Sequence, residues 1–398
     1  MSTFTGLGLM SGTSLDGLDL CCVEFTGDVD ADIWGYRVKF AKTVPYTSEW
    51  RERLGGAASL SGLELIQLHY DYAHYMGKSV KEFLKENELR VDFVATHGHT
   101  VFHQPQKKLT FQLGDGETLA TYLNCPVVAN FRAKDVAMGG QGAPLVPSGE
   151  RFLYNQVALC VNLGGIANVG TRAGGAWDIC PSNMVLNKLA RMYDPNLQYD
   201  EDGEIARKGQ VLPDLLASLE NLEYYRKPPP KSLGEEWVNK HVWPLLDTEK
   251  YRIPDLLRTF VEHVTNRVAE ACAENAHEEP PPSPTIGSSH QQGEATVLIT
   301  GGGAHNTLLM NELRVKLTKK GVAVEKTDNC TVDFKEALVF AYLGLRCLLG
   351  KENVFAETTG ARENCIAGSI HQPPILEPVV TSMHAHFRYL LRRQQSYS

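Results

Sequence analysis

At 398 residues the chain is too long for one ordinary core, so two domains are expected. A hydrophobic content of 43% and a charged content of 22% are those of a globular protein, and the net charge of −8 argues against a broad nucleic-acid surface. Nine cysteines without a CxxC pair indicate neither a disulfide framework nor a zinc site, and we see neither a membrane span nor a signal pattern. We therefore expect a cytoplasmic protein that binds no nucleic acid and no membrane.

The first third of the chain alternates strand-like and helix-like patterns. Two apolar runs, 3–10 and 17–27, flank a polar turn, and the two-residue period of 36–46 predicts a third antiparallel strand. Apolar residues at three- and four-residue spacing predict one long amphipathic helix over 61–87. Two further buried strands are expected at "VDFVATHGHTVF", which ends in a polar loop, and at "CPVVANF".

The second block repeats this layout. "VALCVNLGGIANVG" is an apolar strand broken by a glycine pair and followed by a return strand, and a helix is expected over 253–275. "ATVLITGGGAHNTLLMNELRVKL" predicts a strand, a glycine loop and a helix. The Pro- and Ser-rich segment 277–295 is predicted to be a flexible surface insertion, and 382–398 a basic helix. Two blocks that both open with a strand, a glycine turn and a strand predict two related α/β lobes with a cleft between them.

Three glycine turns favour a nucleotide in that cleft, although no GxxxxGK[ST] motif occurs. In the first turn, 11–19, backbone N–H groups can cradle a phosphate and Asp16 can hold Mg²⁺, directly or through water. The alternative is a polar hairpin whose side chains satisfy one another. The second turn is "NLGGIANV", 162–169, and the third is "TGGGAHN", 300–306, where a strand passes into a helix.

Three histidines in "ATHGHTVFHQP", His97, His99 and His103, leave two interpretations open. An HxH pair can ligate zinc in a hydrolase. No carboxylate follows nearby, however, and two apolar residues separate the second histidine from the third. Hydrogen bonding to a polar ligand is the favoured interpretation.

Glycine-rich loops carry further polar candidates. Arg132 follows a short strand and is the best of them for contact with an anion or a polyol. The others can be structural caps; they are Asp115, Glu117, Asp135 and Gln141.

Two carboxylates remain, each with two interpretations. Asp178 ends a strand before a Cys-Pro turn and is either a general base or a charge at a helix N-terminus. Glu336 lies near the start of an apolar helix and is either a capping residue or an inward acid paired with a cation.

Taken together, six motifs resemble the anhydro-N-acetylmuramic acid kinase family, of which levoglucosan kinase is a related branch. They occur in family order from residue 8 to about 370 and are "MSGTSLDGLD", "THGHTVFHQP", "NFRAKDVAMGGQGAPLVP", "NLGGIANV", "GGGAHN" and "KEALVFAYLG". The resemblance implies a two-lobed actin-like ATPase (ribonuclease H-like) fold with ATP in a cleft between the lobes. We expect lobe I at 1–135, which the segment 373–398 could rejoin, and lobe II at 136–372.

The resemblance also implies a reaction that needs ATP and Mg²⁺. A carboxylate base activates water, which opens the 1,6-anhydro bridge of 1,6-anhydro-N-acetylmuramate, and the freed O6 takes the γ-phosphoryl group. The product, N-acetylmuramate 6-phosphate, belongs to amino-sugar and peptidoglycan recycling. The oligomeric state is left open, with a homodimer as one expectation.

The family's functional residues carry over as follows. The base is Asp178, and Asp16 and Glu336 are the candidates to hold the metal ion. Residues matched to the sugar site are Thr96, His97, Arg132 and Glu336. Residues matched to the nucleotide site are Ser11, Gly12, Thr13, Ser14, Asp16, Asp19, Asn162, Gly164, Gly165, Gly301, Gly302, Gly303 and Asn306.

Two departures keep alternatives open. Where the family typically reads DTGPGN, this chain reads "DICPSN" at 178–183, and where it reads GQT, this chain has "GHT" with His99. Loss of both glycines makes a close approach of backbone to ligand harder. Levoglucosan or another anhydrohexose is therefore an alternative substrate, and a nucleotide-binding sensor without turnover is an alternative of another class.

Overall fold

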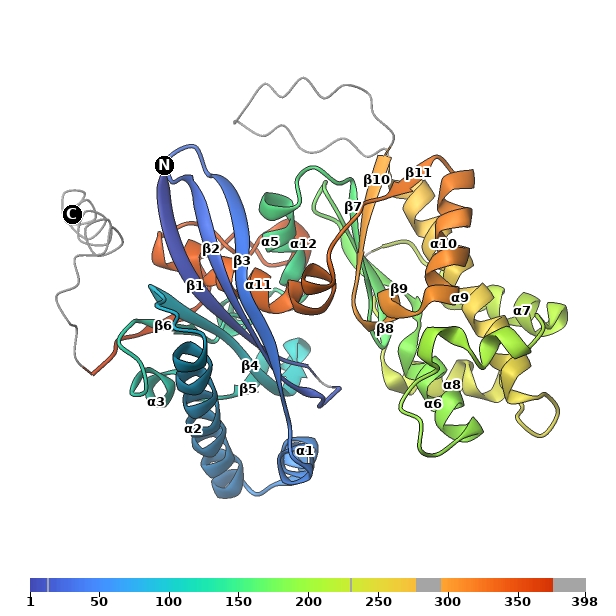
Figure 1. Cartoon of the computed structure of the whole chain (residues 1–398), viewed down its shortest axis with the longest axis horizontal. Coiled ribbons are helices and arrows are strands. Elements are labelled where there is room, and N and C mark those ends of the chain that lie inside the picture. Colours follow the sequence, from blue (N-terminus) through green and yellow to red (C-terminus); the bar gives the residue numbers. More distant parts are fainter. Residues whose placement is uncertain (13, 230, 277–294, 375–398) are drawn as a thin grey trace. The chain divides into compact units, whose positions relative to one another are not determined.

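A computed structural model describes residues 1–12, 14–229, 231–276 and 295–374. The chain forms two compact units (Figure 1). Unit 1 comprises Met1–Leu153 and the chain from Phe334 onward, and unit 2 comprises Tyr154–Asp333. The expected flexible insertion lies outside the described residues apart from Ala295, as do the expected C-terminal helix and all but the first two residues of 373–398.

Unit 1 is built on a seven-stranded sheet in the order β12-β6-β4-β1-β2-β3, with β5 paired to β4. The strands β1, β2 and β3 are antiparallel neighbours, while β1, β4 and β6 run parallel. The strands are β1 (Ser2–Ser11), β2 (Gly17–Asp28), β3 (Ile33–Pro45), β4 (Phe93–Gln104), β5 (Leu109–Leu113), β6 (Val127–Ala129) and β12 (Ser369–His371).

The long helix predicted over 61–87 is confirmed as α2 (Gly62–Glu86). A capping box of Ser61 and Glu64 starts it, and its buried positions recur at helical spacing. The other helices of unit 1 are α1 (Ser48–Gly55), α3 (Gly116–Ala120), α4 (Ala133–Ala137), α5 (Val146–Leu153), α12 (Ala356–Thr359) and the part of α11 (Asn329–Leu348) from Phe334 onward.

The division differs from the expected lobes, because 136–153 and 334–372 belong to unit 1. Close packing of α11 on the sheet explains this. A Cβ atom added to Gly8 of β1 would lie only 1.8 Å from the carbonyl oxygen of Ala337, and one added to Gly149 of α5 would lie 2.7 Å from Val339 Cγ1. The helix therefore covers the strand directly, and α5 packs on the helix.

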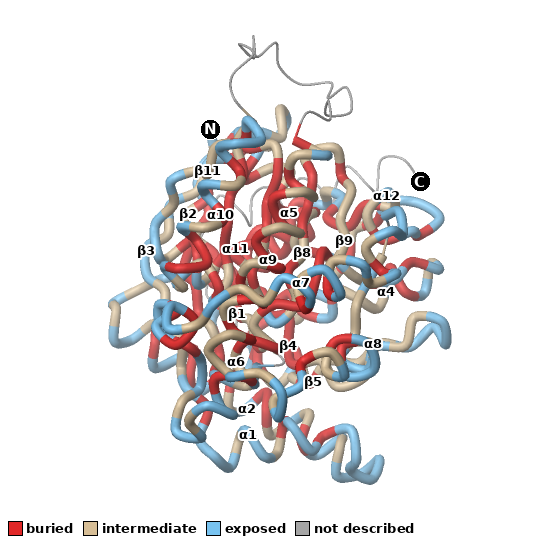
Figure 2. Tube along the Cα trace, turned by 90° about the vertical axis from the view of Figure 1, so that its right-hand side faces the viewer, coloured by how far each residue is buried: buried red, intermediate tan, exposed pale blue. Residues whose placement is uncertain are grey.

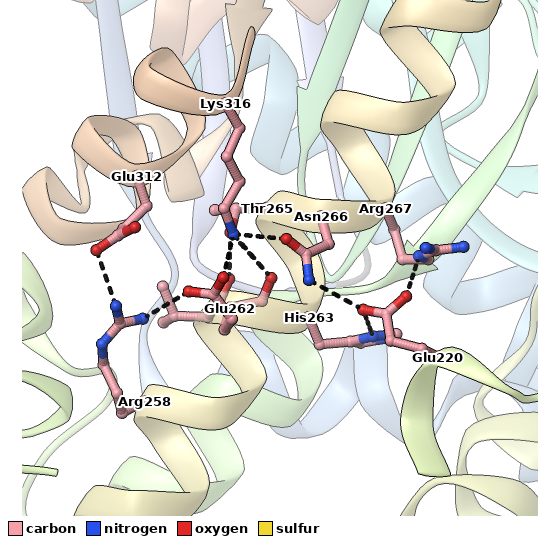
Figure 3. A network of polar contacts seen from close by, with 10 residues as sticks. Glu220, Arg258, Glu262, His263, Thr265, Asn266, Arg267, Glu312 and Lys316 are labelled. Carbon is pink, nitrogen blue, oxygen red and sulfur yellow. Dashed lines mark hydrogen bonds and ion pairs between the residues drawn. The ribbon is translucent and has the colours of Figure 1, made fainter. Parts of the chain in front are cut away.

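Unit 2 is built on a five-stranded sheet in the order β11-β10-β7-β8-β9. Its strands are β7 (Leu159–Leu163), β8 (Ile166–Thr171), β9 (Ala176–Pro181), β10 (Ala295–Thr300) and β11 (Val322–Val324). Its main helices are α6 (Asn183–Tyr193), α7 (Pro213–Glu220), α8 (Glu235–His241), α9 (Ile253–Asn275) and α10 (Thr307–Lys319). Figure 2 shows buried positions running along the strands and the long helices, and none of the described helices is long and apolar enough to cross a bilayer.

The two sheets share one strand order. In each, three antiparallel strands are followed by two that run parallel to the first, so β1-β2-β3-β4-β6 corresponds to β7-β8-β9-β10-β11. This arrangement confirms the prediction of two related α/β lobes of the actin-like, ribonuclease H-like class. As a consequence, the β1–β2 turn corresponds to the β7–β8 turn, and the loop after β4 to the loop after β10.

Candidate functional site

The β1–β2 turn presents fewer free side chains than its sequence suggests. Ser11 is buried, its Oγ accepts a hydrogen bond from the Tyr46 hydroxyl at 2.8 Å, and it lies 3.0 Å from His99 Nδ1. Asp19 accepts a hydrogen bond from Thr43 Oγ1 at 2.6 Å. Ser14 and Asp16 are the exposed polar side chains, Gly12 is half-buried, and Thr13 lies outside the described residues.

The polar loop expected at the end of this strand is part of β4 itself, and within it Thr96 and His97 use their polar atoms to shape the backbone around Gly98. Thr96 Oγ1 accepts the Gly98 N–H at 3.0 Å. His97 Nδ1 lies 2.9 Å from the Gly98 carbonyl oxygen, and its Nε2 accepts a hydrogen bond from Arg132 Nε at 2.9 Å. Burial and the neighbouring guanidinium hold the pKa of His97 well below its usual value, so the ring is neutral and carries its proton on Nδ1.

Arg132 and Asp135 hold one glycine from both sides. Arg132 Nη1 donates to the Gly142 carbonyl at 2.6 Å, while Asp135 Oδ2 accepts the Gly142 N–H at 2.6 Å. The second oxygen of Asp135 accepts from Thr359 Oγ1 at 2.6 Å. Gly142 has a φ of +66°, a conformation that suits glycine. The loop between α4 and α5 is thereby fixed, and Arg132 Nη2 has no acceptor among the described residues.

Glu336 lies beside Arg132 without a partner for its carboxylate. No hydrogen bond or ion pair joins it to any described residue, in contrast to the adjacent Lys335, whose Nζ lies 2.5 Å from Glu150 Oε1. Burial raises the pKa of the Glu336 carboxyl, and the charges of Lys335 and Arg132 oppose this rise. Burial in turn lowers the pKa of Arg132 to about 10, against the attraction of Glu336. In unit 1, therefore, the Glu336 carboxylate lies close to the Arg132 guanidinium. Neither the carboxylate nor Arg132 Nη2 makes a hydrogen bond to a described residue.

The remaining candidates in these loops are structural. Asp115 caps α3 by accepting the Thr118 N–H at 2.7 Å, and Glu117 pairs with His371. The backbone N–H of Gln141 donates to the Thr359 carbonyl at 2.8 Å.

In unit 2 the second and third glycine turns meet. A Cβ atom added to Gly301 would lie 2.3 Å from Asn162 Oδ1, and one added to Gly303 would lie 2.8 Å from Leu163 Cβ. Gly301 has a φ of +84°, so only glycine fits the conformation and the space. The sequence therefore brings the loop after β10 into backbone contact with the β7–β8 turn.

The start of α6 also packs on the β7–β8 turn. The Asn183 N–H donates to the Gly164 carbonyl at 3.1 Å, and the Ser182 and Met184 N–H groups donate to Gly165. The N–H groups of Gly164 and Gly165 make no hydrogen bond to a described residue. Two adjacent backbone donors are what a phosphate-binding turn needs.

The loop after β10 ends in an N-cap. Asn306 accepts the Leu309 N–H at 3.0 Å and starts α10, and the Gly302 N–H makes no hydrogen bond within the described chain. A loop that was not among the predicted site segments, "DEDGEIA" at 200–206, supports this point. Asp200 accepts the N–H groups of Ile205 and Ala206, and a Cβ atom on Gly203 would lie 3.0 Å from Asn306 Oδ1. The D-x-D-G turn pattern was the available signal.

Asp178 lies on β9 with one carboxylate oxygen held and the other free. Oδ2 accepts the Leu233 N–H at 2.8 Å, whereas Oδ1 has no hydrogen-bond partner among the described residues. The backbone of Asp178 is fixed by Lys231 and by the Tyr224 hydroxyl, which donates to its carbonyl at 2.7 Å. Burial raises the pKa of Asp178, and the Leu233 N–H partly opposes this. A half-buried carboxylate with a raised pKa and a free oxygen is suited to accept a proton.

The donors present fit a nucleotide with Mg²⁺ better than a metal held by protein alone. No group of three or more His, Cys, Asp or Glu side chains could hold a metal ion within the described ranges. Mg²⁺ usually keeps several waters and is bound by phosphate oxygens with one or two carboxylates. The exposed Asp16 and the unshared Glu336 are of that kind.

Known proteins match over most of the chain. The family model described as anhydro-N-acetylmuramic acid kinase matches residues 5–373. The chain belongs to the anhydro-N-acetylmuramic acid kinase family. The kinase of that name from Salinibacter ruber is 34% identical over 93% of this chain and 96% of its own length. The one from Vibrio cholerae is 32% identical over 92% and 98%. Among solved structures, the (R)-2-hydroxyglutaryl-CoA dehydratase component A of Acidaminococcus fermentans is 14% identical over 85% of this chain and 96% of its own, with a TM-score of 0.41.

Membership in this family makes the protein an ATP-using phosphotransferase.

Proposed function

We propose that the protein converts 1,6-anhydro-N-acetylmuramate to N-acetylmuramate 6-phosphate with ATP, as part of cell-wall sugar recycling. The observation that carries the proposal is the family match over residues 5–373. The free Oδ1 of Asp178 in unit 2 and the neighbouring side chains of Arg132 and Glu336 in unit 1 agree with it.

Asp178 acts as the general base. Its free Oδ1 takes a proton from water, and the water oxygen bonds to the anomeric carbon as the bond from that carbon to O6 breaks. The freed O6 then attacks the γ-phosphorus of ATP, ADP leaves, and the sugar carries a 6-phosphate. Opening the bridge turns a poorly nucleophilic acetal oxygen into an alkoxide or alcohol that phosphorylation traps.

The glycine turns bind the phosphates. The free N–H groups of Gly164, Gly165 and Gly302 and the exposed Ser14 are the donors that remain for phosphate oxygens, with Asn306 and Gly301 shaping the nucleotide loop. Asp16, with Glu336 as a second candidate, would hold Mg²⁺, which would supply positive charge against the transferring phosphoryl group. Arg132 Nη2 and Glu336 contact the sugar.

Levoglucosan is the second candidate substrate. In the "DICPSN" segment Cys180 and Ser182 stand where the family typically has glycines: both are fully buried, and Ser182 Oγ has no hydrogen-bond partner among the described residues. A smaller sugar without lactyl and acetamido groups would tolerate a narrower site.

The first test is ADP release with Mg-ATP and each sugar separately. We expect turnover of the muramate sugar and a loss of about 10³-fold in Asp178→Asn, the scale of general-base catalysis. Asp194→Asn, a half-buried aspartate that caps the end of α6, is the matched control and should keep its rate. Preference for levoglucosan would assign the alternative substrate. Binding of ATP without turnover of either sugar would replace the kinase by the sensor.

Reaction in ¹⁸O-labelled water separates hydrolytic phosphorylation from plain ATP hydrolysis. The proposed route places the label on the anomeric carbon and none in the sugar phosphate group. Label in free phosphate, with unchanged sugar, would contradict it.

We further propose a cytoplasmic location, which nine cysteines without a disulfide among the described residues favour, and a homodimer. Leu63, Ile66 and Tyr70 lie on one stripe of α2 and are 80%, 55% and 44% exposed. Leu63→Asp should shift the mass measured by light scattering from dimer to monomer; a wild-type monomer would contradict the dimer.

A further inference from the structure

A buried chain of hydrogen bonds fixes the ring of His99. The Tyr46 hydroxyl donates to Ser11 Oγ at 2.8 Å and lies 2.6 Å from the Tyr72 hydroxyl, and Ser11 Oγ lies 3.0 Å from His99 Nδ1. Tyr46, Tyr72 and His99 are all buried. The chain joins β1, β4 and α2 within unit 1.

Counting protons gives the direction of this chain. Among the described residues Ser11 Oγ makes two hydrogen bonds, one that it accepts from Tyr46 and one with His99 Nδ1, so we assign its single hydroxyl proton to the bond with Nδ1. Nδ1 is therefore the acceptor, and the ring proton lies on Nε2. Burial lowers the pKa of His99 to about 4, which agrees with a neutral ring at physiological pH.

The Nε2–H group has no acceptor among the described residues, which sets His99 apart from its neighbour. Both nitrogens of His97 are used, by Gly98 and Arg132, and the Thr96 hydroxyl caps the Gly98 N–H. Of the polar side chains at 96–99, His99 alone keeps an oriented donor with no described partner.

We propose that His99 is a specificity-determining residue whose Nε2–H donates a hydrogen bond to a neutral acceptor oxygen of the anhydro sugar, and that Thr96 and His97 are positioning residues. This rests on the proposed function. Where the family typically has glutamine, an amide can turn and offer either a donor or an acceptor. The fixed tautomer of His99 offers only a donor, so it selects against a sugar that presents a group able only to donate, such as an N–H, at that point.

The first test is heteronuclear NMR on the full-length protein with ¹⁵N-labelled histidine. We expect an unprotonated Nδ1 and a protonated Nε2, and a shift of the Nε2–H signal when the sugar is added. In Ser11→Ala the tautomers should mix, because Nδ1 has lost its donor. A wild-type ring protonated on Nδ1 would overturn the proposal.

The second test separates KM from kcat. His99→Leu should raise the KM for the sugar about tenfold, the value of one buried hydrogen bond, while the KM for ATP stays within about threefold. His99→Gln, which restores a donor, should recover part of the sugar affinity. His74→Gln on the exposed face of α2 is the control and should match the wild type.

The outcomes distinguish this proposal from the function on which it rests. If the wild type turns over the sugar and a folded His99→Leu variant has an unchanged KM for it, the role of His99 is overturned and the proposed function stands. If His99→Leu fails to fold, the NMR measurements on Ser11→Ala and on the wild type titrated with sugar still test the proposal. A His99 Nε2–H signal that does not shift although the wild type turns over the sugar contradicts the contact. Absence of both turnover and sugar binding in the wild type overturns the proposed function and this role with it.

Discussion

Arg132 Nε donates to His97 Nε2 at 2.9 Å, so a cation holds a neutral histidine in one tautomer. The same guanidinium donates a hydrogen bond to the Gly142 carbonyl at 2.6 Å, and the negative charge of Glu336 attracts it. Three separate parts of unit 1, strand β4, the loop before α5 and helix α11, depend on one planar side chain.

Arg132→Lys should lower kcat/KM for the sugar at least about 100-fold, because an ammonium cannot make these contacts together with the fork geometry of a guanidinium. ATP affinity should change less than about threefold. Arg151→Lys is the control, since Arg151 makes a single half-exposed ion pair with Glu357. Steady-state kinetics on both variants checks the prediction, and a wild-type rate in Arg132→Lys would contradict it.

The acidic limb of the pH profile should report Asp178. A general base must be ionised, and burial raises the pKa of this carboxyl, so kcat/KM should fall as the pH drops through a value above the ordinary aspartate pKa of about 3.9. Leu233→Pro removes the N–H that favours the ionised form, and the limb should move to higher pH. Ser232→Pro, at a position whose N–H makes no hydrogen bond to a described residue, is the control. A limb unmoved by Leu233→Pro would argue against Asp178 as the group observed.

Local features of the fold could be predicted from the sequence, and long-range ones could not. The period of α2 and the strand–turn–strand patterns lie within short windows, so they are visible in the order of residues. Packing of α11 on β1 depends on Gly8 and Ala337, which are far apart in sequence, and this is why the expected division differs from the two units.

The candidate site shows the same limit. Residue types indicated Asp178, Arg132 and Glu336, but no pattern links Asp178 to the Leu233 N–H or Ser11 to Tyr46 and His99. The sequence thus predicts which groups are polar and near a turn. Which of their atoms remain free is decided by contacts between distant segments.

The buried Glu336 carboxylate should lower the free energy of unfolding at neutral pH, although sugar turnover needs it. Burial raises the pKa of its carboxyl, so folding favours the protonated form. The stability from this preference is present below the unfolded glutamate pKa of about 4.3 and is lost as the pH rises through the raised pKa. Glutamine stays neutral throughout, so Glu336→Gln should melt at a higher temperature than the wild type at about pH 7.5, with the difference vanishing below about pH 4.

Thermal unfolding of the ligand-free protein across that pH range is the measurement, with the exposed Glu52→Gln as control. Sugar turnover by Glu336→Gln should be lost in the same samples. A variant less stable than the wild type at neutral pH would mean that the carboxylate has a stabilising partner.

Gly301→Ala should disable the nucleotide loop, and Gly321→Ala supplies a control with a similar backbone. Both glycines have positive φ, +84° and +73°, so alanine strains each by about 1 kcal/mol. A Cβ atom at Gly301 would also lie 2.3 Å from Asn162 Oδ1 and 3.0 Å from the Leu163 carbonyl carbon, whereas nothing lies within 4 Å of one at Gly321. The β7–β8 turn must therefore move in Gly301→Ala, and the N–H groups of Gly164 and Gly165 move with it.

We expect ATP affinity, measured by calorimetry, to fall at least about tenfold in Gly301→Ala and to stay unchanged in Gly321→Ala. The backbone strain should lower the free energy of unfolding by similar amounts in the two variants. Equal ATP affinity in the two variants would show that the contact between the two glycine turns does not shape the nucleotide site.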